Sequence, residues 1–219
     1  MCNQDLWQFV FPKIEPYEPE YIDITSATSF DEINAIMHSK IVSPAIIIGF
    51  SLGGFCALNF ASQYPEKVDK VISIAASAKG LSDHEIRLRK STIDFLETHQ
   101  YKGISNSRVK QFLHLDNHQN ETITTIIKKM DTDLGKEVLI RQLKATSQRI
   151  DITDKLKKIS NPILLIGSKE DNLVLAQDIL ALNKELRTSF SIILKNCGHM
   201  IPLEKPNEII EIIHNYLTK

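Results

Sequence analysis

The sequence G-F-S-L-G at Gly49–Gly53 holds one serine between two glycines, directly after the apolar run Ala45–Ile48. A buried strand, a turn of small residues and the start of a helix form the layout of a nucleophile elbow, whose strained turn exposes the serine hydroxyl above a sheet. Glycine tolerates the close backbone approach of such a turn, and Gly54 adds a small residue where the next helix passes the strand. Ser51 is therefore the candidate nucleophile. The simpler alternative is an ordinary serine in a glycine-rich turn.

A serine hydroxyl at neutral pH needs a general base within hydrogen-bond reach, and that base needs a group to orient it. Asp171 follows the predicted strand Pro162–Ile166 within the loop G-S-K-E-D. His199 follows the predicted strand Phe190–Leu194 within the loop K-N-C-G-H-M. Functional groups collect at the carboxyl ends of parallel strands, so we expect both side chains to reach Ser51 there. The alternatives are a solvated or helix-capping aspartate and a histidine that serves only its own loop.

Strands alternate with helices along most of the chain. Short apolar runs rich in β-branched residues predict strands at Tyr21–Ile24, Ala45–Ile48, Lys70–Ala75, Pro162–Ile166 and Phe190–Leu194. Helical patterns accompany them at Ser29–Ser39, Leu52–Tyr64, Leu175–Glu185 and Asn207–Tyr216. Several strands are apolar on both faces, which is typical of a parallel sheet covered by helices on each side. The sequence therefore predicts an α/β fold with a mostly parallel sheet, in one domain that spans residues 1–219.

The segment Ser82–Leu156 has a different pattern, because it contains charged, helical-looking runs and no convincing strand. These runs are Asp83–His99, Ser107–Phe112, Glu121–Met130 and Gly135–Ser147. Connections between neighbouring strands are usually much shorter. We therefore interpret residues 80–156, approximately, as a helical insertion between two strands of the sheet. A set of ordinary crossover helices is the alternative.

Composition limits the classes of function. The 219 residues carry 26 basic and 27 acidic side chains, so the net charge of −1 points to neither nucleic acid nor an anionic membrane. No apolar stretch approaches the roughly 20 residues of a spanning helix, and the N-terminus lacks the pattern of a signal peptide, so we expect a cytoplasmic protein. Cys2, Cys56 and Cys197 have unrelated spacings that indicate neither a disulfide framework nor a metal site. The glycine spacing fits no phosphate-binding motif, so no cofactor is expected.

Three motifs together resemble the α/β-hydrolase fold superfamily, in particular small lidded carboxylesterases and thioesterases. They are G-F-S-L-G-G at Gly49–Gly54, P-I-L-L-I-G-S-K-E-D at Pro162–Asp171 and C-G-H-M-I-P-L-E-K-P at Cys197–Pro206. The resemblance covers nearly the whole chain. It implies that the helical insertion is a lid and that the substrate is a small ester or thioester. It also implies an acyl-enzyme mechanism, for which no metal is needed.

The resemblance gives each residue a role. Ser51 attacks a carbonyl carbon, His199 takes and returns the proton, and Asp171 holds the imidazole. The backbone N–H of Leu52, the residue after the nucleophile, donates a hydrogen bond to the oxyanion. Apolar side chains that could line an acyl pocket, though each is more often a core residue, are Phe50, Met200, Leu52, Phe95, Phe112 and Leu113.

The chain departs from the family at its N-terminus. The family's second oxyanion donor comes from a loop after an early strand, whereas the segment Cys2–Trp7 resembles the stretch just beyond that loop. The missing strand would lie between Tyr21–Ile24 and Ala45–Ile48, so its absence predicts either a gap in the sheet or direct pairing of the two neighbours. Two explanations stay open. The start is placed too late, or the protein is a shortened form with poor activity.

Other functions also stay open at this stage. Carbon–carbon hydrolases and lyases reuse the same three residues. A catalytically impaired member of the fold could act as a binding protein, or the chain could be a fragment of a hydrolase. Thiol chemistry at Cys197 or Cys56 is a further class, which we disfavour because the nucleophile is already assigned. The sequence leaves substrate identity and oligomeric state undetermined.

Overall fold

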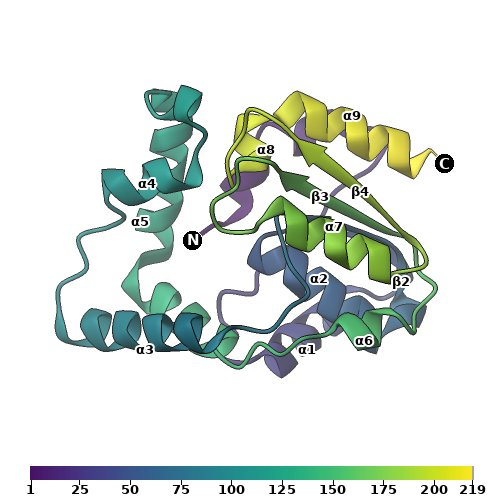
Figure 1. Ribbon diagram of the computed structural model, residues 1–219, viewed down its shortest axis with the longest axis horizontal. Coiled ribbons are helices and arrows are strands. Elements are labelled where there is room, and N and C mark those ends of the chain that lie inside the picture. Colours follow the sequence, from purple (N-terminus) through teal and green to yellow (C-terminus); the bar gives the residue numbers. More distant parts are fainter. Residues whose placement is uncertain (219) are drawn as a thin grey trace.

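The computed structural model describes residues 1–218 and contains one sheet of four parallel strands (Figure 1). The strands are β1 (Ala45–Phe50), β2 (Val68–Ile74), β3 (Ile163–Ser168) and β4 (Ser189–Leu194). They lie in the order β1-β2-β3-β4, and each pairs with its neighbour in parallel. The predicted α/β class and four of the five predicted strands are therefore confirmed.

Two hydrophobic clusters cover the two faces of the sheet. Alternate residues of β3 enter different clusters, because side chains along a strand point to opposite faces: Leu164 and Ile166 join one, Ile163 and Leu165 the other. On the second face pack α1 (Phe30–Lys40), α2 (Leu52–Gln63), α6 (Thr153–Leu156) and α7 (Ala176–Glu185). On the first face lie the short helix η1 (Gln4–Trp7), α8 (Ile201–Glu204) and α9 (Pro206–Leu217).

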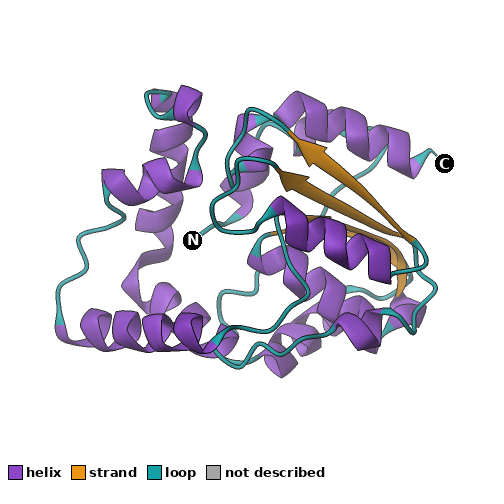
Figure 2. Ribbon diagram, in the orientation of Figure 1, coloured by secondary structure: helices purple, strands orange, loops and turns teal. Residues whose placement is uncertain are grey.

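The chain between β2 and β3 forms a group of helices that projects to one side of the sheet (Figures 1 and 2). It comprises α3 (Asp83–Thr98), α4 (Asn106–Phe112) and α5 (Glu121–Thr146). Gly135, with φ 70° and ψ −179°, interrupts α5, which explains why the sequence shows two separate helical runs there. The remaining short helices are η2 (Phe11–Lys13), η3 (Pro65–Lys67) and η4 (Leu115–Asn117). None of the helices in residues 1–218 is both long and apolar enough to cross a membrane.

The predicted strand at Tyr21–Ile24 does not form, and this prediction is wrong. The segment has no regular secondary structure, and within residues 1–218 β1 pairs with β2 alone. A cavity of about 700 Å³ lies beside β1, and all of β1 lines it together with residues 18–22, Ile24 and Thr25. Among the described residues β1 is thus an edge strand of the sheet, and neither expected outcome, a gap between two strands or direct pairing of Tyr21–Ile24 with β1, is observed. A strand needs a partner for its backbone groups, so an apolar pattern alone could not make this segment a strand.

The turn from β1 into α2 is built from close backbone contacts. Ser51 occupies φ 52° and ψ −113°, a strained conformation for a residue with a side chain. A Cβ at Gly49 would lie 2.1 Å from the Gly53 carbonyl oxygen, and a Cβ at Gly54 would lie 2.7 Å from the Ala76 Cβ. The predicted steric reason for glycine therefore holds at Gly49 and Gly54. It does not hold at Gly53, where a Cβ would meet no atom within 4 Å.

Gly49→Ala and Gly53→Ala should consequently have opposite effects on stability. Gly49→Ala forces the turn apart and should lower the free energy of unfolding by about 3 kcal/mol, which for a chain of this size lowers Tm by about 6–12 °C. Gly53→Ala should leave the free energy of unfolding unchanged or raise it by up to about 1 kcal/mol, because alanine stabilises a helix more than glycine does. Thermal unfolding followed by circular dichroism measures both. Equal destabilisation of the two variants would contradict the contacts at Gly49.

Candidate active site

The carboxyl ends of β1, β3 and β4 bring together the three residues that the sequence singled out. The Oγ atom of Ser51 lies 3.0 Å from Nε2 of His199, and Nδ1 of His199 lies 2.8 Å from Oδ2 of Asp171. His199 and Asp171 are buried, whereas Ser51 is partly accessible. The arrangement places a basic ring between a hydroxyl and a carboxylate, each within hydrogen-bond distance.

The Asp171 carboxylate is held at both oxygens. Oδ1 accepts the backbone N–H groups of Leu173 at 2.7 Å and of Val174 at 3.0 Å, while Oδ2 faces His199. The side chain therefore does two things that the sequence offered as alternatives. It orders the turn before α7, and it contacts the histidine. The turn in exchange fixes the direction of the carboxylate.

Backbone hydrogen bonds fix the loop that carries His199. The N–H groups of His199 and Met200 both donate to the carbonyl of Phe112, at 2.8 and 3.2 Å. The N–H of Asn196, a residue at φ 55°, donates to Glu170 at 3.0 Å. The position of the imidazole is thus set by a residue at the end of α4 as well as by its own loop.

Glu204 also holds the loop that carries His199, a role that was not predicted from the sequence. Its Oε1 accepts the N–H of Gly198 at 2.8 Å, and its Oε2 accepts the N–H of His114 at 2.8 Å and the side-chain amide of Asn117 at 2.9 Å. Gly198 approaches this segment so closely that a Cβ would lie 2.6 Å from the carbonyl carbon of Leu113. The sequence feature that could have indicated this role is the acidic residue that directly follows the apolar residues M-I-P-L. One carboxylate therefore joins the histidine loop to the segment after α4.

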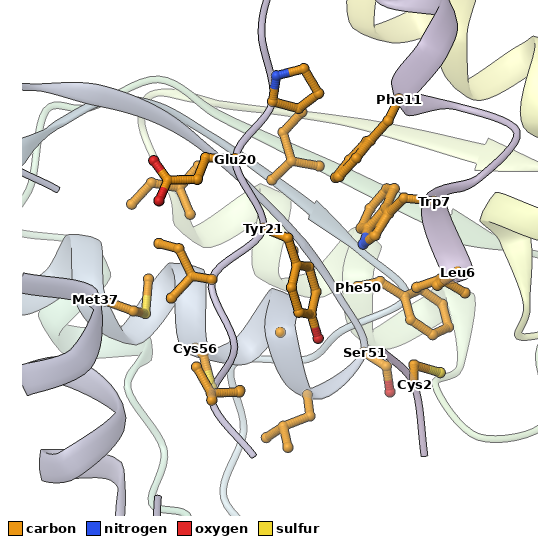
Figure 3. A pocket seen from close by; sticks show the side chains of 18 of the residues that line it. Cys2, Leu6, Trp7, Phe11, Glu20, Tyr21, Met37, Phe50, Ser51 and Cys56 are labelled. Atoms are coloured by element: carbon orange, nitrogen blue, oxygen red, sulfur yellow. The ribbon is translucent and has the colours of Figure 1, made fainter. Parts of the chain in front are cut away.

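The cavity beside β1 reaches the candidate site, because Ser51 and His199 both line it. Figure 3 shows Ser51 at its wall. Phe50 and Met200, the two predicted substrate-binding residues, line it as well, as do Leu52 and Phe112. The ring centroid of Phe50 lies 5.0 Å from that of His199. Two other apolar candidates lie elsewhere. Phe95 is exposed and stacks on His99, and Leu113 is buried in the core.

The first turn of α2 presents backbone donors at the site. The Ser51 side chain does not cap this helix, and the first N–H groups of any helix lack partners within it. The N–H of Leu52, the predicted oxyanion donor, belongs to this turn. The positive end of the helix dipole adds to its attraction for a negative oxygen.

The buried cysteines are poor thiolate candidates. Burial raises the pKa of Cys56 to about 12, and burial likewise raises the pKa of Cys197 to about 11. Both are therefore thiols at neutral pH, and thiols are weak nucleophiles. Among residues 1–218, no group of three or more histidine, cysteine or acidic side chains is arranged to hold a metal ion.

Removing the charge of Glu204 should loosen the histidine loop. In Glu204→Gln, an amide NH₂ replaces one of the two accepting oxygens and faces N–H donors, so the free energy of unfolding should fall by about 2 kcal/mol. Urea unfolding measures this change. Glu208→Gln is the matched control, because Glu208 is 46% exposed and forms an ion pair with Lys205 at 3.2 Å, a type of pair worth at most about 1 kcal/mol. Similar losses in both variants would contradict the role given to Glu204.

Comparisons with known proteins agree with this fold and this geometry. The family model described as alpha/beta hydrolase fold matches residues 12–206. A thermophilic esterase of Thermogutta terrifontis has a similar structure, with a TM-score of 0.86 and 17% sequence identity over 99% of this chain and 85% of that chain. At this identity the likeness concerns the fold alone.

Two sequence relatives are more informative. The chain is 25% identical to a pimeloyl-[acyl-carrier protein] methyl ester esterase of Hamiltonella defensa, over 99% of this chain and 89% of the relative. It is 27% identical to the uncharacterized hydrolase YugF of Bacillus subtilis (strain 168), over 80% of this chain. The chain spans 66% of the length of that hydrolase. The family match over most of the sequence, together with the fold, shows that this chain belongs to the alpha/beta hydrolase fold family.

Proposed function

We propose that the chain is a serine hydrolase that cleaves a small ester or thioester through an acyl-enzyme. The observation that carries this proposal is the pair of distances around His199, 3.0 Å to the Ser51 hydroxyl and 2.8 Å to the Asp171 carboxylate. A nucleophile and a base within hydrogen-bond reach, with the base oriented by a third group, form the signature of covalent catalysis by serine.

In the proposed reaction, Ser51 Oγ attacks the carbonyl carbon while its proton passes to Nε2 of His199. The tetrahedral intermediate then collapses, and the imidazolium gives that proton to the leaving alcohol or thiol. A water molecule next attacks the acyl-enzyme, with His199 again as the base, and releases the acid. Both half-reactions balance, because each proton that His199 accepts is returned to a departing group.

Asp171 serves this cycle as the orienting group. Its contact with Nδ1 keeps the other ring nitrogen, Nε2, free of a proton and directed at Ser51. It also stabilises the imidazolium that forms in each half-reaction. The N–H of Leu52 donates a hydrogen bond to the oxyanion, because negative charge develops on this oxygen in the transition state.

Ester chemistry is the best-supported reaction within the family. Several sequence relatives are named as methyl ester esterases, including those of Hamiltonella defensa and Wigglesworthia glossinidia brevipalpis. Phe50 and Met200 give the cavity apolar walls next to Ser51, which suits a small acyl group. Gln142 of α5 also lines the cavity, so the helices between β2 and β3 form part of its wall. We therefore propose that residues 80–156, approximately, act as a lid on a single domain.

Hydrolysis of p-nitrophenyl butyrate tests the proposal. Ser51→Ala should lower kcat by at least about 10³-fold, because the nucleophile is lost. Asp171→Asn should lower kcat by about 10⁴-fold, because the imidazole takes the wrong tautomer. Ser39→Ala is the control, since this exposed serine on α1 bonds only the carbonyl of Ile36, and it should retain the wild-type rate.

Labelling with a fluorophosphonate distinguishes the hydrolase from a binding protein of the same fold. An activated Ser51 should be labelled in the wild type and in Ser39→Ala, but not in Ser51→Ala. Failure of the folded wild-type chain both to be labelled and to hydrolyse the ester would contradict the proposed function. It would favour the alternative that this chain only binds its ligand.

A further inference from the structure

An acyl-transfer site needs more than one donor for the oxyanion. Removal of a single donor typically lowers kcat by about 10²–10³-fold. The Leu52 N–H at the start of α2 supplies one donor. Ser51 also lines the cavity beside β1, which is the edge strand of the sheet among the described residues. A side chain on the far wall of this cavity can therefore offer a second donor.

Tyr21 stands on that wall. Its segment lacks secondary structure, and its side chain crosses the cavity, as Figure 3 shows. In this view the phenol oxygen lies between Ser51, at the start of α2, and Cys56, in the next turn of that helix. Tyr21, Ser51 and Leu52 all line the same cavity. In Figure 3 the Tyr21 side chain thus points toward the part of the cavity that Ser51 lines.

The Tyr21 hydroxyl is available as a donor. No group among the described residues forms a hydrogen bond with it, and only burial and nearby negative groups affect its titration. Burial, with smaller contributions from Asp23 and Cys2, raises the pKa of Tyr21 to about 12. The phenol therefore keeps its proton at neutral pH and can donate a hydrogen bond to a molecule bound in the cavity.

We propose that the Tyr21 hydroxyl is the second oxyanion donor of this site. The inference rests on the proposed serine hydrolase function and adds a residue to it. In the tetrahedral intermediate, the oxyanion accepts one hydrogen bond from the Leu52 N–H and one from the Tyr21 O–H. No proton is transferred, because the phenol only donates a hydrogen bond and regains its free state when the intermediate collapses. A side chain thus does what a backbone N–H from a loop commonly does.

Tyr21→Phe tests this proposal with one atom removed. It should lower kcat for p-nitrophenyl butyrate by about 100-fold, with KM nearly unchanged, because the hydrogen bond forms only with the transition state. Tyr216→Phe is the matched control. The Tyr216 hydroxyl is buried and has no hydrogen-bond partner among the described residues, burial raises its pKa to about 12, and the residue does not line the cavity. It should keep the wild-type kcat.

Two further measurements separate an oxyanion donor from a structural residue. A trifluoromethyl ketone forms a tetrahedral adduct with the serine, so its inhibition constant should rise in Tyr21→Phe by about the factor by which kcat/KM falls. Replacement of Tyr21 by 3-fluorotyrosine keeps both ring and hydroxyl, and should retain a rate within a few-fold of the wild type even if the phenylalanine variant folds poorly.

Specific outcomes would overturn the assignment. An unchanged kcat in folded Tyr21→Phe, or a raised KM with unchanged kcat, would show that the hydroxyl does not contact the oxyanion. A loss of kcat in Gln142→Leu but not in Tyr21→Phe would move the role to the amide of Gln142, which also lines the cavity. An inactive wild type that is not labelled at Ser51 would instead contradict the proposed function itself, so the two failures are distinguishable.

Discussion

Parallel hydrogen-bonded pairing of β1, β2, β3 and β4 fixes where every loop of the candidate site leaves the sheet. The register places one residue of each strand in a single row across the sheet, namely Phe50, Ile74, Ile166 and Ile192. Because all four strands run in the same direction, the loops after β1, β3 and β4 all leave the sheet at the carboxyl ends of the strands. Ser51 and His199 meet there although 148 positions separate them in sequence. The short distances at the site are thus a consequence of strand direction.

Periodicity and local motifs made much of this fold predictable. Apolar runs located β1 to β4, and G-F-S-L-G located a turn whose strain appears at Ser51, with φ 52°. The order serine, aspartate, histidine along the chain identified three side chains that the structure brings together. Each of these inferences depends on residues that are neighbours in sequence, or on the common direction of parallel strands, so a single sequence contains the necessary information.

Features that depend on distant partners could not be predicted. Tyr21–Ile24 has the pattern of a strand, but strand formation depends on the neighbouring segment, and here a cavity lies beside it. The role of Glu204 depends on His114, 90 positions away, whose N–H it accepts. Phe95 and Leu113 were plausible pocket residues until the orientation of the helices between β2 and β3 turned one outward and buried the other. Composition gives no measure of that orientation.

The open edge of β1 gives the cavity a mixed character. Within residues 1–218 this strand pairs on one side only, with β2, so its remaining backbone N–H and C=O groups face the cavity and need water or a bound molecule as partners. Phe50 and Met200 make the wall next to Ser51 apolar. In the proposed reaction, an acyl group contacts the apolar wall while water binds along the strand edge. Hydrolysis of an acyl-enzyme needs both features, because the second half-reaction consumes a water molecule at the same carbonyl carbon.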